Sequence, residues 1–253
     1  MTFAIYPSLA GRNVFISGGA TGIGADLVRA FAQNHARIAF VDVQRAEGEA
    51  MSAAVKGEGG TALFLDCDVT DVVALQASIA EARAKLGPIA VLVNNAANDE
   101  RHAVADVTAE YWDHAQNVNL RHHFFAAQAV HPQMRELGFG SIINLSSIAW
   151  RGAAEMPAYA AAKAGIVGLT NALARAFGSD NIRVNAIEPG AVMTDRQRRL
   201  WYKTRESVDA IVQRQSIKTT LLGEDIARMA LFLAADDSRM ITKQSIIVDA
   251  GLR

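Results

Sequence analysis

The sequence predicts an α/β protein built as one doubly wound domain, with about seven parallel strands and helices on both faces of the sheet. Short apolar runs alternate with longer helical patterns along all 253 residues, and no linker divides them. Near-continuous apolar strands separated by helices are typical of a parallel sheet covered on both faces, with right-handed crossovers. We therefore expect residues 1–253 to form a single domain.

The predicted strands are short runs of β-branched and apolar residues. They are NVFIS (13–17), RIAFVD (37–42), TALFL (61–65), IAVLVN (89–94), SIINLS (141–146), IRVNAI (182–187) and SIIV (245–248). Ligands of such folds bind beyond the carboxyl ends of the strands, so the residues after each run are expected to carry the function.

Two helices can be placed from the pattern. Ile23, Leu27 and Phe31 recur at spacings of four, which indicates one apolar helical face. A Thr-Asp pair at 70–71 predicts the start of a second helix, which ends near the Leu-Gly-Pro run at 86–88.

Composition and charge narrow the class of function. The chain is 51% hydrophobic and 20% charged, without charge blocks or low-complexity tracts, which is typical of a soluble globular protein. Its formal net charge of -1 provides no broad attraction to nucleic acid or to an anionic membrane. We therefore expect a small-molecule partner, with no nucleic acid and no membrane.

The first residues and the cysteine content indicate the compartment. MTFAIYPSLAGR has neither a basic region nor an apolar run suited to export, and no apolar segment approaches the roughly 18 residues of a membrane span. Cys67, the one cysteine, cannot form an internal disulfide and is expected to be a small buried side chain. These observations predict a cytoplasmic protein.

A glycine-rich turn, SGGATGIG, follows the first predicted strand and precedes a helix. Glycines permit the tight turn and let the backbone approach a pyrophosphate, which the helix N-terminus would stabilise. The spacing Gly-x-x-x-Gly-x-Gly differs from the Gly-x-Gly-x-x-Gly fingerprint. Its position between strand and helix predicts a dinucleotide site made by Gly18, Thr21, Gly22, Ile23 and Gly24.

Acidic residues after the next two strands suggest how the adenosine end is bound. Asp42 ends the second strand, where a carboxylate would accept hydrogen bonds from the ribose hydroxyls. Because it would repel a 2′-phosphate, NAD is favoured over NADP, although the nearby Arg45 weakens that preference. Asp68, just past the third strand, would either meet the adenine or cap the following helix, and both interpretations stay open.

The fourth strand leads into NNAANDERH. Asparagine amides at a strand end can hold neighbouring backbone or a cofactor, and small alanines leave room for a bulky ligand. Asn95 and Ala96 are therefore expected at the cofactor.

AYAAAKAGIVGLT, residues 158–170, is an alanine-rich helical pattern that carries Tyr159 and Lys163. The gap of four places both side chains on one helical face, so that the phenol and the ammonium can lie side by side. They are either a chemical pair or an exposed tyrosine and lysine on a surface helix.

Together these segments resemble the short-chain dehydrogenase/reductase family over essentially the whole chain. The matching motifs are the Gly18/Gly22/Gly24 turn, NNAA at 94–97, Asn119 in NVNL, Ser147 in NLSSIAW, Tyr159 and Lys163 in YAAAK, and PGAVMT at 189–194. Each is common by chance, whereas their order and spacing together are specific. The resemblance implies a Rossmann-type fold, an NAD(P)-dependent oxidoreductase, and cofactor contacts that also include Val69, Pro189, Gly190, Val192 and Thr194.

The resemblance also implies a catalytic tetrad of Asn119, Ser147, Tyr159 and Lys163. A phenol has a reference pKa of about 10, and a neighbouring ammonium together with a positive nicotinamide would lower it toward the working range. Tyr159 would then accept the substrate hydroxyl proton while hydride leaves the same carbon. Lys163 would also hold the nicotinamide ribose, and Asn119 would order a water that relays the proton.

Two adjacent serines compete for the position that orients the substrate oxygen. Ser146 lies 13 positions and Ser147 lies 12 positions before Tyr159, and the family usually shows 13. In the family's paired serines the second is usually catalytic, and strand alternation lets only one of two neighbours face the site. We choose Ser147, with a loop at 148–158 that is one residue shorter.

The sequence departs from the family pattern at four positions. Ser17 replaces a threonine, and Ala97, Lys243 and Ala250 stand where glycines are usual. None of these residues belongs to the tetrad.

Substrate choice is expected in the loops at 98–104 and 148–157 and in a lid at 191–218, because they follow strands at the open end of the sheet. Their polar and aromatic content predicts a polyhydroxylated ligand rather than a lipid. The expected substrate contacts are Asn98, Arg101, His102, Trp150 and Glu155.

Within the family, NDERHAVADVT, YWDHAQNVNLRH and SSIAW most resemble bacterial aldose 1-dehydrogenases, particularly those for D-xylose and similar pentoses. The implied reaction oxidises the anomeric hydroxyl of a cyclic sugar to the lactone, and NAD takes the hydride. One alternative is oxidation of a secondary hydroxyl on a sugar acid or a 2-keto-3-deoxy acid, with Arg101, Arg151 or the arginines at 196, 198 and 199 receiving the carboxylate. An alternative of another class is a catalytically silent dinucleotide sensor.

Two further expectations concern metals and assembly. The pair at 122–123 is two histidines without the spacing of a HExxH motif, so no catalytic metal is expected. Family members usually form tetramers through the helix that carries the Tyr-Lys pair, and small residues at 161, 164, 165 and 168 would permit close helix contact. The sequence therefore predicts a homo-oligomer.

Overall fold

The computed structural model describes residues 3–253 and contains a seven-stranded sheet in the order β3-β2-β1-β4-β5-β6-β7, in which all neighbouring strands are parallel. The strands are β1 (Asn13–Ser17), β2 (Arg37–Asp42), β3 (Thr61–Asp66), β4 (Val91–Asn94), β5 (Gly140–Leu145), β6 (Ile182–Pro189) and β7 (Ser245–Val248). The predicted doubly wound fold and each of its seven strands are confirmed, with bounds that shift by two residues at most.

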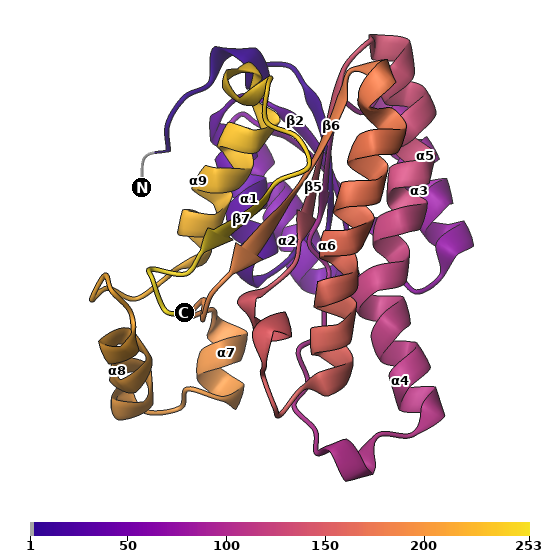
Figure 1. Ribbon diagram of the computed structural model, residues 1–253. Coiled ribbons are helices and arrows are strands. Elements are labelled where there is room, and N and C mark those ends of the chain that lie inside the picture. The colour runs from indigo at the N-terminus through magenta and orange to yellow at the C-terminus, as the bar shows by residue number, and fades with distance from the viewer. Residues whose placement is uncertain (1–2) are drawn as a thin grey trace.

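Helices cover both faces of this sheet, with α1, α2 and α9 on one side and α3, α5 and α6 on the other (Figure 1). The helices are α1 (Gly22–Gln33), α2 (Arg45–Gly57), α3 (Val72–Leu86), α4 (Ala109–Gln116), α5 (His122–Leu137), α6 (Pro157–Phe177), α7 (Asp195–Leu200), α8 (Arg205–Arg214) and α9 (Gly223–Ala234). Short helical turns are η1 (Pro7–Leu9), η2 (Val104–Asp106), η3 (Asn117–Arg121), η4 (Ile148–Arg151), η5 (Gly178–Asp180) and η6 (Asp236–Ser238).

Strand β1 shows why the apolar runs form central strands. Val14 and Ile16 are fully buried beneath the helices of the first face, and Phe15 is fully buried beneath those of the second. Side chains alternate between faces along a strand, so a continuous apolar run serves two cores at once. Each large side chain buried this way contributes about 1.5–3 kcal/mol.

The ends of α3 follow from local chemistry. Asp71 precedes the helix, and its carboxylate accepts a hydrogen bond from the Ala74 amide at 3.0 Å, which caps the first turn. The helix ends before Gly87, whose φ of +97° favours glycine. The start predicted at 70–71 and the end predicted near 86–88 are confirmed.

A π-helical turn, η3, separates α4 from α5 within what would otherwise be one helix. Its wider winding places Asn119 inside the fold, and the Asn119 amide donates to the Ala115 carbonyl at 2.9 Å. Such single wide turns are frequent at functional sites.

Lys243 and Ala250, two of the departures from family glycines, adopt left-handed backbone with φ of +63° and +56°. The backbone path that glycine usually takes is therefore kept, at a cost of roughly 1–2 kcal/mol for each side chain.

Segment 191–218 contains α7 and α8 and lies at the carboxyl end of the sheet (Figure 1). Its base is closed by a backbone hydrogen bond of 2.9 Å from the Met193 amide to the Leu221 carbonyl, and both residues are buried. Within residues 3–253 no helix has both the length and the apolar character needed to cross a bilayer.

Candidate active site

A cavity of about 1100 Å³ opens at the carboxyl ends of the strands. The predicted site residues that line it are Gly18, Thr21, Gly22, Ile23, Gly24, Asp42, Asp68, Val69, Asn95, Ala96, Asn98, Arg101, Ser147, Glu155, Tyr159, Lys163, Pro189, Gly190, Val192 and Thr194. Three predicted residues, Asn119, His102 and Trp150, lie outside this lining.

The glycine-rich turn fits a dinucleotide by its close approaches. A Cβ on Gly24 would lie 1.7 Å from the Gly18 carbonyl oxygen, and a Cβ on Gly22, where φ is +56°, would point at Thr194 from 3.4 Å. The turn therefore admits no side chain at Gly24, and it leads directly into the N-terminus of α1, where an anion can be bound. Asn95 locks this shape, because its amide donates to the Gly18 carbonyl at 2.8 Å.

Ser17 explains how one departure from the family pattern is accommodated. Its hydroxyl accepts hydrogen bonds from the Asn95 and Ala96 amides at 3.0 and 3.1 Å. A serine supplies the same oxygen as a threonine, so the β4 turn is held in place.

Asp42 lies at the end of β2 in the cavity wall, only 8% exposed. Its carboxylate accepts from the Ala20 and Gln44 amides, each at 3.0 Å, and so ties the glycine-rich turn to the end of β2. Arg45 points elsewhere, with ion pairs to Asp66 at 3.5 Å and to Glu49 at 3.7 Å.

Asp68 and Val69 line the same end of the cavity. The Asp68 carboxylate accepts from the Thr70 amide at 2.8 Å, whereas the cap of α3 is Asp71. The interpretation of Asp68 as the helix cap is therefore wrong, because the helix begins one turn later.

Tyr159 and Lys163 lie on the first turns of α6 and face the chemical end of the cavity. The Lys163 ammonium is 5.3 Å from the centre of the Tyr159 ring and donates to the Leu145 carbonyl at 2.7 Å. Burial lowers the pKa of Lys163 to about 7, and the Asp99 carboxylate opposes that shift.

The pKa of Tyr159 moves in the direction opposite to the one expected. Burial, which removes water from a phenolate, raises it, and the Asp99 carboxylate raises it further. A hydrogen bond with Ser147 lowers it. The expected lowering depends on a positive nicotinamide ring together with Lys163, and it stays a prediction for the enzyme with its cofactor bound.

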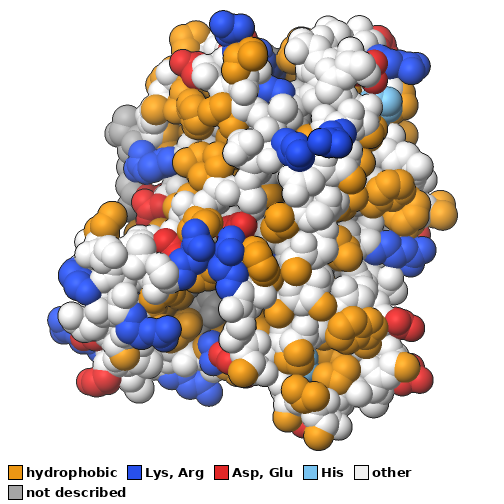
Figure 2. Space-filling view, viewed as in Figure 1, with side chains coloured by type: hydrophobic (Ala, Val, Ile, Leu, Met, Phe, Trp, Pro, Cys, Tyr) orange, Lys and Arg blue, Asp and Glu red, His pale blue; other side chains and the backbone are white. Residues whose placement is uncertain are grey.

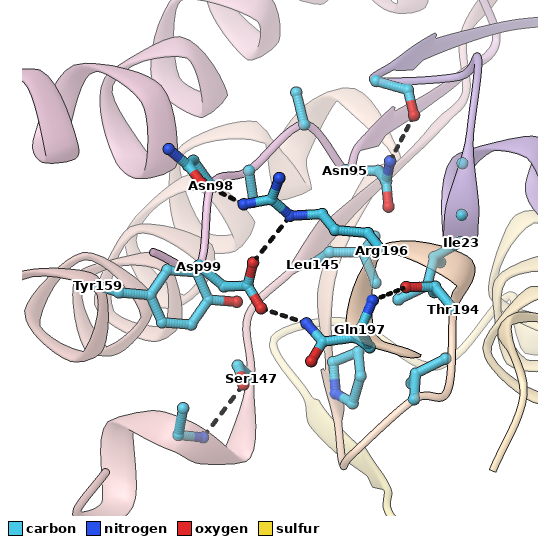
Figure 3. A pocket seen from close by; sticks show the side chains of 18 of the residues that line it. Ile23, Asn95, Asn98, Asp99, Leu145, Ser147, Tyr159, Thr194, Arg196 and Gln197 are labelled. Carbon is cyan, nitrogen blue, oxygen red and sulfur yellow. Dashed lines mark hydrogen bonds and ion pairs between the residues drawn. The ribbon is translucent and has the colours of Figure 1, made fainter. Parts of the chain in front are cut away.

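The two serines turn to opposite sides. The Ser146 hydroxyl is buried and donates to the Lys163 carbonyl at 2.7 Å. The Ser147 hydroxyl accepts from the Ala149 amide at 3.1 Å and lies beside Tyr159. The geometry therefore favours Ser147 as the serine that meets a substrate oxygen (Figure 3).

Asn119 is brought close to the cavity but not into its lining. Its side-chain oxygen accepts from the Asn98 amide at 2.8 Å, and its nitrogen donates to Ala115. The oxygen thus anchors the loop after β4 at the residue before Asp99, and the nitrogen ties the π-helical turn to α4.

Loop 98–104 meets α7 across the cavity (Figure 3). Arg196 donates to the Asn98 side chain at 2.8 Å and to the Asp99 carboxylate at 3.2 Å, and the Gln197 amide also donates to Asp99. Asp99 and Gln197 lie in the loop and the lid that were expected to choose the substrate, and Arg196 is one of the arginines expected to receive a carboxylate in the sugar-acid alternative.

Of the other expected substrate residues, two line the cavity and two bond neighbouring segments instead. Arg101 and Glu155 line the cavity, 3.8 Å apart, and the Arg101 guanidinium lies 4.5 Å from the Trp201 ring. His102 bonds the Tyr111 hydroxyl at 2.8 Å. Trp150 donates to Glu188 at 3.0 Å, so it holds the loop rather than facing the cavity.

Basic side chains gather over α7 and α8, beside the mouth of the cavity (Figure 2). Arg196, Arg199 and Arg214 from these helices line it, with Asp195 and Glu155 among them. The rim therefore carries both signs of charge.

Comparison with known proteins places this site in context. Residues 18–253 match the family described as enoyl-(acyl carrier protein) reductase. The chain is 49% identical over 249 residues to the probable galactose dehydrogenase GalD of Rhizobium meliloti (strain 1021), covering 98% of this chain and 97% of the relative. It is 44% identical over 254 residues to the D-xylose 1-dehydrogenase of Caulobacter vibrioides (strain NA1000 / CB15N), covering all of both.

A solved structure agrees with the fold. The blue fluorescent protein from a metagenomic library, crystallised in complex with NADPH, superposes with a TM-score of 0.89 at 33% identity, over 97% of this chain and 99% of that one. The glycine turn, the Tyr-Lys pair on one helix and full-length similarity to two dehydrogenases agree with one another. The chain belongs to the short-chain dehydrogenase/reductase family, an oxidoreductase family that uses NAD(P).

Proposed function

We propose that this enzyme oxidises the anomeric hydroxyl of an aldose to the lactone, with NAD as the hydride acceptor. The observation that carries the proposal is the joint placement of Ser147 and Tyr159 in a cavity whose other wall is polar, at Asn98, Asp99 and Glu155. Donors and acceptors in that number suit a polyhydroxylated ligand. Relatives named for galactose and D-xylose support the same substrate class.

The preference for NAD rests on the adenosine end. Asp42 presents a carboxylate at the cavity wall, and Arg45 is paired with Asp66 instead of facing a 2′-phosphate. A 2′-phosphate placed beside Asp42 would meet like charge. We therefore expect a higher kcat/KM with NAD than with NADP.

The chemistry follows from the groups around Tyr159. Ser147 would hold the reacting hydroxyl, and Tyr159 would take its proton as the carbon loses hydride. Bound NAD would supply the hydride acceptor and a positive charge that favours phenolate. Lys163 keeps two ammonium protons for the cofactor ribose after its bond to Leu145.

The alternative of a sugar-acid substrate has less support from the arginines. Arg151 is committed to the buried Glu188 at 2.8 Å, and Arg196 is committed to Asp99. Arg199 lines the cavity and remains a candidate for a carboxylate. Initial rates on free aldoses and on sugar acids separate these two substrate classes.

The test is the initial rate of NADH formation with D-galactose, D-xylose, L-arabinose and D-glucose, beside their aldonates and 2-keto-3-deoxy acids. We expect turnover of free aldoses, with kcat reduced at least about 10²-fold in Tyr159→Phe. Turnover of the acids alone would replace the aldose proposal with secondary-hydroxyl oxidation. Tight NADH binding without any turnover would indicate a dinucleotide sensor.

Two structural proposals accompany this function. Segment 191–218 acts as the substrate lid, since α7 reaches across the cavity to Asn98 and Asp99. The protein is a homo-oligomer that packs through α6, where Ala161, Ala164 and Gly168 are exposed. Light scattering that shows only a ~27 kDa species would contradict the second proposal.

A further inference from the structure

Asp99 is a carboxylate placed against the group that must lose a proton. It follows β4 in loop 98–104, and its side chain is directed toward Tyr159 in the cavity (Figure 3). Its charge raises the pKa of Tyr159. Since this opposes formation of the phenolate, the proton transfer to Tyr159 gives no reason for a carboxylate here.

The partners of Asp99 show what the carboxylate can do. Arg196 donates to one oxygen at 3.2 Å, and the Gln197 amide donates to the other. The Asp99 side chain is 21% exposed, so each oxygen needs a donor when the cavity is closed. Both donors come from α7 and neither from the rigid sheet.

A bound sugar offers a replacement for one of these donors. Hydroxyls on adjacent carbons of an aldose donate well to carboxylates, and a charge-assisted bond of this kind is roughly twice as strong as a neutral one. The Asp99 carboxylate lies beside Tyr159 (Figure 3), where a hydroxyl on the carbon next to the reacting one would be able to meet it. The sugar hydroxyl would replace the Gln197 amide at one oxygen of Asp99, while Arg196 keeps its ion pair with the other oxygen.

We propose that Asp99 is a specificity-determining residue, which accepts a hydrogen bond from the hydroxyl on the carbon next to the one oxidised. The enzyme thereby selects vicinal polyols over simple alcohols and over 2-deoxy sugars. This inference rests on the proposed aldose oxidation, in which that hydroxyl is the one at C2.

The test compares kcat/KM for D-galactose and 2-deoxy-D-galactose in the wild type and in Asp99→Asn. We expect the wild type to prefer D-galactose by about 10- to 100-fold, because an analogue without the hydroxyl cannot make the charge-assisted bond to the carboxylate. In Asp99→Asn the loss should fall on D-galactose, so that the preference drops to within about threefold. Taking the ratio in both proteins cancels the intrinsic difference in reactivity between the two sugars.

Asp106→Asn provides a matched control, since Asp106 is an exposed carboxylate on the same β4–α4 connection and lies outside the cavity lining. It should keep the wild-type preference. An Asp99→Asn protein with an undiminished preference for D-galactose would overturn the inference. So would a wild type that turns over both sugars equally well, a result that needs no variant to fold.

The two levels of proposal fail in different ways. If the wild type oxidises no aldose, the proposed function fails, and the role of Asp99 falls with it. If the wild type oxidises D-galactose and the preference ignores Asp99, the aldose function stands and only the role of Asp99 is lost.

Discussion

Ser146 and Ser147 are neighbours in the chain, yet they act on different parts of the molecule. Backbone at the end of β5 is extended, with φ of -171° and ψ of 150° at Ser147, so adjacent side chains point in opposite directions. The Ser146 hydroxyl ties the sheet to α6 through the Lys163 carbonyl, and the Ser147 hydroxyl lies beside Tyr159.

We predict that Ser147→Ala lowers kcat by about 10²-fold with the preferred aldose, since it removes the hydroxyl that lies beside Tyr159. Ser146→Ala should keep kcat near the wild-type value and lower the free energy of unfolding by about 1 kcal/mol, the worth of one buried hydrogen bond. Steady-state rates and urea unfolding of the two variants measure both effects. The reverse pattern would identify Ser146 as the catalytic serine.

At this scale the sequence could predict the residue types but not all of their directions. The count of positions before Tyr159 favoured Ser146, while strand alternation and the family motif led to Ser147. The pairing of Asp99 with Arg196 and Gln197 could not be predicted, because these two residues lie almost a hundred positions away in the chain. His102 and Trp150 were expected at the substrate for their chemistry, whereas their contacts hold loops.

At the scale of elements, Glu188 joins three parts of the fold. This carboxylate on β6 is 1% exposed and accepts from Trp150 at 3.0 Å and Arg151 at 2.8 Å, both in η4, and from Ser245 on β7. A buried carboxylate is tolerated because donors occupy both oxygens. The loop that carries Ser147 is therefore tied to the two strands at the edge of the sheet.

We predict that Glu188→Gln lowers the free energy of unfolding by about 1–3 kcal/mol, because Arg151 and Trp150 lose a charged partner. Glu136→Gln is the matched control, since Glu136 pairs with Arg83 at 2.6 Å on the exposed surface, and such pairs contribute about 1 kcal/mol or less. Urea unfolding compares the two. A smaller loss for Glu188→Gln than for Glu136→Gln would show that the network does not support the loop.

Element boundaries were predictable where a cap or a glycine stands at the end, as at Asp71 and Gly87 in α3. The π-turn at η3 was not, because no residue type signals the extra residue in a turn. The hydrogen bonds of the buried Asn119 amide with Ala115 and Asn98 depend on this turn, so they could not be predicted either.

At the scale of the whole molecule, two buried histidines make stability depend on pH. His122 and His123 are fully buried on α5, with ring centres 4.4 Å apart. Burial, with Lys163 nearby, lowers the pKa of His122 to about 3, and burial also lowers that of His123. Their unfolded pKa is about 6.5, so below that pH the unfolded chain binds protons that the native protein does not.

We therefore predict that the free energy of unfolding falls as pH drops from about 6.5 to 4, with a slope of up to ~1.4 kcal/mol per pH unit for each buried histidine. His122→Gln should reduce the slope by about one proton, and its amide can still donate to the Ala96 carbonyl that His122 bonds at 3.1 Å. Urea unfolding at pH 7, 6 and 5 measures this. His114→Gln, on the exposed face of α4, should leave the slope unchanged; equal slopes in all three proteins would contradict the assignment.

The architecture of the whole chain was the most predictable level. Apolar runs such as VFI in β1 must be buried on two faces, and that requirement admits few alternatives to a covered parallel sheet. The glycine turn then fixes which end binds the dinucleotide. How α7 reaches across to loop 98–104 depends on side-chain pairing over long sequence distances, which periodicity does not report.

The hydrogen bond between Met193 and Leu221 holds together the two ends of the segment that carries α7 and α8. Because these two buried residues adjoin, the chain enters and leaves the helical excursion between them at one spot. Residues can therefore be inserted, deleted or replaced in α7 and α8 without changing the relative positions of β6 and α9. A change confined to this stretch would therefore leave Tyr159 and Lys163 in place on α6.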